Sequence, residues 1–123
     1  ARIQRNVEAP RATEYRLFAQ VTAALDDARA RALKGSALMD ALDWNRRMWL
    51  TLAHDCAQEG NQLAPALRGQ LISLALFVNR QSSAIMRGQA DIADLIDINR
   101  TVMQGLADAP PQPAVRDAET RLA

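Results

Sequence analysis

The spacing of apolar residues between glycines and prolines constrains this chain more than any other feature. Breaking residues fall at Pro10, Gly35, Gly60, Gly88 and Gly105, and between them apolar residues recur every three or four positions. That period places apolar side chains along one face of an α-helix. No stretch shows the two-residue alternation of a half-buried strand. The pattern predicts an all-α fold, a small bundle of about four helices.

The ends of these helices carry recognisable signals. Gly35 suits the left-handed position that closes a first helix, and Ser36 and Asp91 are the expected N-caps of the second and fourth. Pro65 fits the first turn of the third helix, where its missing N–H has no partner to lose. The predicted helices occupy four ranges: 11–34, 36–59, 65–88 and 91–105.

The domain organisation follows from these helices. Residues 11–106 form one helical domain, preceded by an N-terminal arm over 1–10 that could also hold an extra helical turn. Residues 107–123 contain several prolines and few large apolar residues, which indicates a flexible, largely disordered, Pro-rich C-terminal tail. The run LISLALFV over 71–78 is apolar nearly all round, so we expect the third helix at the centre of the bundle.

The bulk composition limits the functional classes. The apolar fraction of 49 % is enough for one core, while 15 basic and 14 acidic residues give a net charge of only +1. A dedicated nucleic-acid binder usually has a clear basic excess. The single cysteine cannot form an intramolecular disulfide. Because no run is long and apolar enough to span a membrane and no signal peptide is evident, we expect a cytoplasmic protein.

Two asparagines lie within apolar stripes. Asn45 and Asn99 both occur in an x-Asn-Arg tripeptide, as does Asn79, which falls on the shoulder of its helix. A buried amide must find hydrogen-bond partners, and such groups can fix the register of packed helices. We therefore predict that Asn45 and Asn99 are buried, hydrogen-bonded core residues. An internal duplication is the alternative, but the sequence around the tripeptides matches poorly.

Residues with catalytic chemistry are scarce. His54 is the only histidine and Cys56 the only cysteine, and two residues apart on a helix they point in nearly opposite directions. They form neither a nucleophile–base pair nor a metal site. The sequence has no phosphate-binding glycine loop, hydrolase elbow or metalloprotease motif. We expect no catalytic residues, no metal, no cofactor and no enzymatic activity.

The stretch DWNRRMW over 43–49 is the most distinctive surface candidate. Trp49 falls on the apolar stripe, whereas Trp44, Arg46 and Arg47 project from the shoulder or the outer side. One shoulder tryptophan beside two arginines is more typical of a protein contact than of an RNA platform. Aromatics on an apolar stripe usually pack inside, so core is the alternative reading for one candidate, Phe18. The candidate partner-binding residues are Tyr15, Phe18, Trp44, Arg46 and Arg47.

Four segments together resemble the FlaF family of flagellar biosynthesis regulators. The resemblance extends from Pro10 to Leu106, and the segments occur in the order and spacing of the family. They are PRATEYRLFAQVTAAL (10–25), ALDWNRRMWLTLAHDC (41–56), EGNQLAPALRGQLISLALFVNR (59–80) and DLIDINRTVMQGL (94–106).

This resemblance implies a role that the residues alone do not reveal. It implies a non-enzymatic cytoplasmic protein that promotes flagellin synthesis and export, binds flagellin as a secretion chaperone or adaptor, and acts with the partner regulator FlbT. Flagellin ends in amphipathic helices, which suit a helix-in-groove mode of recognition. The alternative is a post-transcriptional regulator that contacts flagellin mRNA directly or through FlbT, although direct nucleic-acid binding is disfavoured by the net charge.

Overall fold

A computed structural model describes the backbone of residues 2–108 and the side chains of residues 14–105. Over this part of the chain it contains four helices and no strand, which confirms the predicted all-α class. None of the described helices has the length and hydrophobicity of a membrane-spanning segment. The helices are α1 (Arg2–Ala30), α2 (Gly35–Ala57), α3 (Pro65–Met86) and α4 (Ala93–Asp108).

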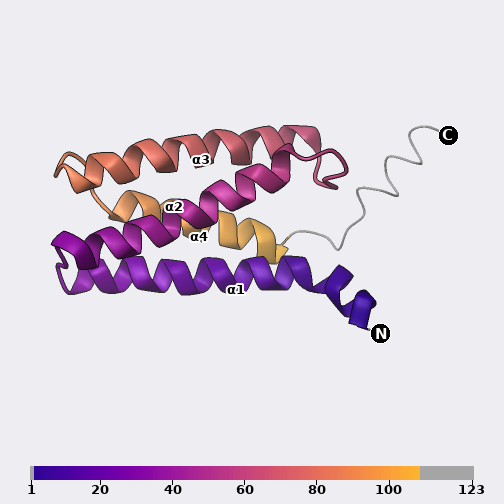
Figure 1. The fold of residues 1–123 in the computed structure, drawn as a ribbon, viewed down its shortest axis with the longest axis horizontal. Coiled ribbons are helices and arrows are strands. Elements are labelled where there is room, and N and C mark those ends of the chain that lie inside the picture. Colours follow the sequence, from indigo (N-terminus) through magenta and orange to yellow (C-terminus); the bar gives the residue numbers. More distant parts are fainter. Residues whose placement is uncertain (1, 109–123) are drawn as a thin grey trace.

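The helices are arranged with α2 in the central position. In Figure 1, α1 and α3 form opposite edges of the molecule, α2 crosses between them and α4 lies behind α2. Helix α1 packs on α2 and α4, whereas α3 packs closely on α2 and only lightly on α4. The prediction that α3 occupies the centre is therefore wrong. Its apolar run has one close neighbour rather than three.

The apolar core is built around Trp49. Its side chain is fully buried and meets Phe18 of α1 edge to face, with ring centroids 5.5 Å apart. Such an aromatic pair stabilises by about 0.5–1.5 kcal/mol beyond the area that it buries. The remaining large, fully buried apolar side chains come from all four helices: Val21, Leu25, Leu42, Val78, Leu95 and Ile96.

A hydrogen-bonded polar cluster crosses this core, with Asn99 of α4 as its hub. The indole Nε1 of Trp49 donates to Asn99 Oδ1 at 2.9 Å, and Asn99 Nδ2 donates to Asn45 Oδ1 at 2.8 Å and to Thr22 Oγ1 at 3.1 Å. Both asparagines are fully buried, as predicted. Asn45 Nδ2 has no acceptor among the described residues. The cluster joins α1, α2 and α4, which a shift of any one helix would disrupt.

The turn between α1 and α2 differs from its prediction. Helix α1 ends in a Schellman motif, in which Leu33 N donates to Ala28 O at 2.9 Å and Ala32 N donates to Arg29 O. The left-handed residue of this motif is Ala32, with φ of 51°; Gly35 is left-handed too, with φ of 60°, but it lies beyond the motif. Gly35 instead begins α2, so the predicted Ser36 cap lies inside the first turn.

The ends of α3 and α4 follow their signals more closely. Pro65 is the first residue of α3, and Gly88, with φ of 73°, closes the turn after it. Gln89 N donates to Ala84 O at 2.8 Å, which completes a second Schellman motif. Asp91 Oδ1 accepts from Ala93 N at 2.9 Å, so this carboxylate caps the start of α4 as expected.

The two ends of the chain differ from the predicted boundaries. Helix α1 begins at Arg2, so the expected arm over 1–10 is helical over most of its length, and Figure 1 shows the first turns bent away from the rest. Pro10 lies within α1, and a proline inside a helix removes a backbone hydrogen bond and bends it. At the other end α4 continues to Asp108. The rest of the predicted tail, 109–123, lies outside the described residues.

Candidate partner-binding surfaces

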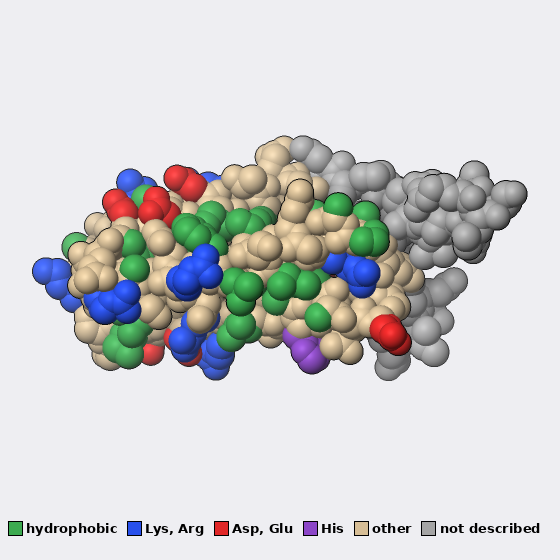
Figure 2. All heavy atoms as spheres, turned by 90° about the horizontal axis from the view of Figure 1, so that it is seen from above, with side chains coloured by type: hydrophobic (Ala, Val, Ile, Leu, Met, Phe, Trp, Pro, Cys, Tyr) green, Lys and Arg blue, Asp and Glu red, His purple; other side chains and the backbone are tan. Residues whose placement is uncertain are grey.

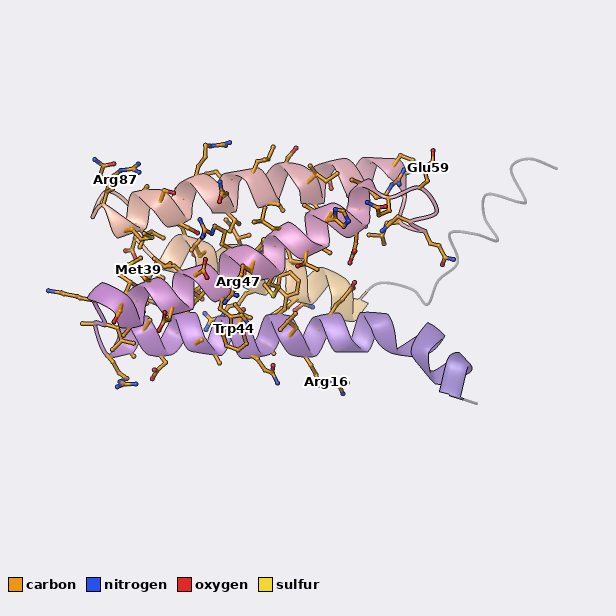
Figure 3. The ribbon with its side chains drawn as sticks, in the orientation of Figure 1. Arg16, Met39, Trp44, Arg47, Glu59 and Arg87 are labelled. Atoms are coloured by element: carbon orange, nitrogen blue, oxygen red, sulfur yellow. The ribbon has the colours of Figure 1, made fainter. Side chains whose placement is uncertain are left out.

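The aromatic candidates predicted from the sequence separate into surface and core. Tyr15 and Trp44 are 39 % and 38 % exposed, whereas Phe18 is only 2 % exposed because it packs against Trp49. Phe18 therefore offers no surface to a partner in this structure. The prediction that it binds a partner is wrong, and the alternative, a core position, is right. Figure 3 shows Trp44 on the side of α2 that faces α1.

The two arginines of DWNRRMW are held by one carboxylate. Arg46 Nη2 lies 2.5 Å from Asp43 Oδ1 and Arg47 Nε lies 3.1 Å from Asp43 Oδ2. The hydrogen bond from Arg46 lowers the pKa of Asp43 below its usual value, desolvation opposes this, and the charges of Arg47 and Arg46 lower it further. Since Asp43 stays ionised, it balances one of the two positive charges on this surface.

The only histidine and cysteine do not form a reactive pair. Cys56 is buried, and burial raises the pKa of its thiol, with the nearby charges of Glu14 and Asp55 raising it further. A neutral buried thiol is a poor nucleophile. His54 is exposed and its Nε2 lies 3.3 Å from Gln58 Nε2. Within the described residues, no group of three or more metal-binding side chains converges.

The outer side of α3 is unusually apolar for a helix at the edge of a molecule. Leu76 is 56 % exposed and Phe77 is also exposed. The only charged residues of α3 are Arg68 and Arg80, and the helix contains no acidic residue. Figure 2, which views the molecule from the α3 side, shows hydrophobic side chains gathered along the middle of this face. Contiguous exposed apolar surface commonly marks a binding site.

The register between α2 and α3 aligns exposed apolar residues of both helices. The two helices run antiparallel, with Met39 and Met86 at one end of the pair lining the same hollow. At the other end Arg68 Nη1 donates to Cys56 O at 3.4 Å. An antiparallel register through these two contacts places Leu50 of α2 near the level of Leu76 of α3.

This register defines a surface that we call the α2–α3 groove. On α2, Met39, Arg46 and Leu50 are spaced seven and four residues apart and therefore share one face of the helix. On α3, Ile72 and Leu76 are likewise four residues apart. The hollow near its methionine end has a volume of about 200 Å³, and Ser82 and Ser83 form part of its wall. The groove residues that line the hollow are Met39, Asp40, Asp43, Arg46, Ser83 and Met86, and we group with them Ile72 and the exposed Leu50 and Leu76, which continue the stripe along the same two helices.

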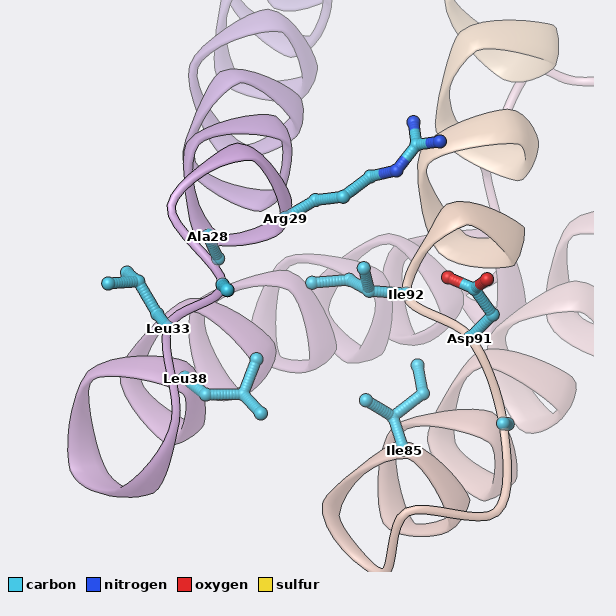
Figure 4. Close-up of a pocket in the computed structure, with 9 residues that line it drawn as sticks. Ala28, Arg29, Leu33, Leu38, Ile85, Asp91 and Ile92 are labelled. Atoms are coloured by element: carbon cyan, nitrogen blue, oxygen red, sulfur yellow. The ribbon is translucent and has the colours of Figure 1, made fainter.

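A second hollow lies at the end of the bundle where α1 turns into α2. Its volume is about 340 Å³ and it is wide open to solvent. Figure 4 shows its mainly aliphatic lining, with the Arg29 and Asp91 side chains at its edge. This lining has no convergent set of polar groups that would orient a small ligand.

The sequence missed the α2–α3 groove for a specific reason. The sequence of 71–78 predicts burial within the chain, because a helix that is apolar all round needs cover on every side. In the structure Leu76 and Phe77 lack that cover. The apolar run was visible in the sequence. The spacing of apolar residues does not show whether a helix face is buried by the same chain or by a partner.

Comparison with known proteins identifies the family. The family model described as flagellar protein FlaF matches residues 1–106, which includes all the described core and the α2–α3 groove. No curated protein and no solved structure matches the chain significantly. The match covers most of the chain and agrees with the resemblance of the four segments. The chain therefore belongs to the FlaF family of flagellar proteins.

Proposed function

We propose that this protein is a non-enzymatic cytoplasmic factor that promotes flagellin synthesis and export by binding flagellin as a secretion chaperone or adaptor. Membership of the FlaF family supports a role in flagellum biogenesis. In this proposal the protein acts together with the FlbT regulator. The contribution of the chain itself is to cover an aggregation-prone surface of its client until export.

The observation that carries this proposal is the uncovered apolar surface of α3 and α2. Exposed leucines and methionines on both helices line the α2–α3 groove, and α3 is bordered by a single outward arginine, Arg80. Methionine side chains are flexible and polarisable, which suits a surface that accommodates a client helix. The terminal regions of flagellin form amphipathic helices, whose apolar stripes need such cover before assembly.

The surface around Trp44 is a weaker candidate. Arg47, and Arg46 which also lines the α2–α3 groove, are held by Asp43, and the tryptophan contributes one partly exposed ring. Direct contact with flagellin mRNA would favour several stacking aromatics and unpaired cations. The buried state of Trp49 removes the second aromatic from that role. Protein binding therefore accounts for the geometry better than RNA binding.

A pull-down with purified components tests the proposed function. Tagged full-length protein is mixed with purified unassembled flagellin, and we expect the two to elute together from a size-exclusion column. A gel shift with the flagellin leader RNA and no other protein tests the alternative, since direct binding would weaken steeply with salt. RNA binding without flagellin binding would overturn the proposal.

A further inference from the structure

We infer that the α2–α3 groove holds a single amphipathic helix of the client, oriented with its acidic flank beside Arg80 of α3. The identity of the client rests on the function proposed above, whereas the site and the chemistry of its occupant follow from the groove itself. The structure supports this assignment through the length of the groove, its hollow and its charge.

The length of the groove matches one helix. Its α3 stripe runs from Ile72 to Met86, which is about 21 Å at the rise of an α-helix. An occupant of about four turns would therefore span it. Because α2 and α3 pack closely against each other, a third helix that packs across both could bury the exposed sides of Leu50 and Leu76.

The hollow at the methionine end suits a large apolar anchor. It lies between Met39 and Met86, both about half exposed, and the buried Leu42 also lines it, while Asp40, Asp43 and Arg46 of α2 form its charged side. Small side chains at Ser82 and Ser83 leave room in its wall. Binding energy usually concentrates in one or two side chains that fill such a pocket. We expect a Leu, Ile, Phe or Met of the client helix here.

Charge selects the flank of the occupant. Arg80 follows Leu76 by one turn and makes no ion pair with any described residue. No carboxylate on α3 competes for it, because α3 contains none. A client helix with Asp or Glu beside its apolar stripe would satisfy this arginine, whereas a lysine at the same place would be repelled.

The same charge pattern disfavours a symmetric contact between the α3 helices of two copies of this chain. A two-fold dimer brings the same surface of each copy together. Two α3 helices packed in this way would supply arginines from both sides and no carboxylate from either. A symmetric contact through α3 thus leaves Arg80 without a counter-charge.

The inference is tested with two synthetic helices of about four turns, identical in their leucine stripe. One has glutamates and the other lysines along the flank, and binding of each to the full chain is measured by isothermal titration calorimetry. We expect the glutamate helix to bind about tenfold or more tightly than the lysine helix. Arg80→Glu should reverse this order, whereas Arg16→Glu, on the far side of α1 (Figure 3), should leave it unchanged.

Purified flagellin supplies the second readout. Leu76→Glu should weaken its binding by about tenfold or more, while Trp44→Glu, a matched exposed change on the other side of α2, should not. Flagellin binding that is equal in wild type, Leu76→Glu and Arg80→Glu would overturn the inference and leave the proposed function standing. If flagellin fails to bind at all, the proposed function fails, and the synthetic helices still decide whether the groove selects acidic helices. A Leu76-dependent dimer of the wild type in sedimentation analysis would overturn the inference.

Discussion

The two sides of helix α2 are covered in different ways. The side toward α1 and α4 contributes to stability, and the side toward α3 is the one that we expect to bind a partner. On one side α2 meets α1 and α4 around Asn99, whose amide joins Thr22, Asn45 and Trp49. On the other side α2 meets α3, whose buried contacts are mainly aliphatic. The first side is fixed by directional bonds. The second combines a non-directional interface with an uncovered apolar surface.

The largest expected effects come from a carboxylate placed on α3, either at a buried position or at an exposed one. Val78→Glu puts a carboxylate at a fully buried position of α3, and we expect it to lower the free energy of unfolding by more than about 4 kcal/mol. Leu76→Glu lies on the exposed side and should change that free energy by about 0.5 kcal/mol or less. Urea unfolding followed by circular dichroism measures both. Equal losses would mean that Leu76 is a core residue.

The polar cluster is tested next, by removal of its hub. Asn99→Ala leaves Trp49 Nε1 and Asn45 Oδ1 without their partners inside the core, so we expect a loss of about 3 kcal/mol. Asn79→Ala is the matched control, because Asn79 occurs in the same kind of tripeptide but is exposed. Its substitution should cost about 0.5 kcal/mol or less. Thermal unfolding monitored by Trp fluorescence and circular dichroism compares the two variants.

The two Schellman turns provide a smaller test, away from both sides of α2. Ala32 and Gly88 occupy equivalent left-handed positions. The left-handed conformation costs a non-glycine residue about 1–2 kcal/mol, partly offset by the greater chain entropy of unfolded glycine. Ala32→Gly should therefore stabilise by about 0.5–1 kcal/mol, and Gly88→Ala should destabilise by a similar amount. A Cβ at Gly88 meets no atom within 4 Å, so the backbone conformation alone sets this cost.

The smallest effect concerns the exposed carboxylate of Asp43. Its pKa is lowered in the folded state, so its contribution to stability is present above the pKa of the unfolded chain and disappears as the pH falls through the folded pKa. Arg46→Ala should raise the pKa of Asp43 more than Arg47→Ala, since the Arg46 hydrogen bond is the largest cause of the shift. A carboxyl-detected NMR titration measures both shifts. A larger effect from Arg47→Ala would contradict this arrangement.

The parts of the fold that sequence predicted are those set by local chemistry. Three- and four-residue spacing located the helices, and Pro65, Gly88 and Asp91 marked their ends because each has a backbone role that few other residues fill. The position of Asn45 and Asn99 within apolar stripes predicted their burial. It did not predict that Trp49 donates to Asn99, because that contact joins helices distant in sequence.

The parts that sequence missed depend on what covers each helix. The run 71–78 contains enough apolar residues for complete burial, yet α4 covers α3 only lightly and leaves Leu76 exposed. Phe18 is a candidate contact residue with a core position as the alternative, and its packing against Trp49 shows that the core position is the right one. Ala32 rather than Gly35 closes α1, although both residues are left-handed. These outcomes follow from tertiary packing rather than from local preference.

Site-specific photocrosslinking to unassembled flagellin tests the central claim most directly, because it reports which side of α2 meets the client. Leu76→Cys and Trp44→Cys, each labelled with a benzophenone maleimide, place the probe on the α2–α3 groove or on the opposite side of α2. The native Cys56 is buried and should label slowly. We predict efficient crosslinking to flagellin from position 76 and little from position 44. The reverse pattern would contradict the account and assign binding to the surface around Trp44.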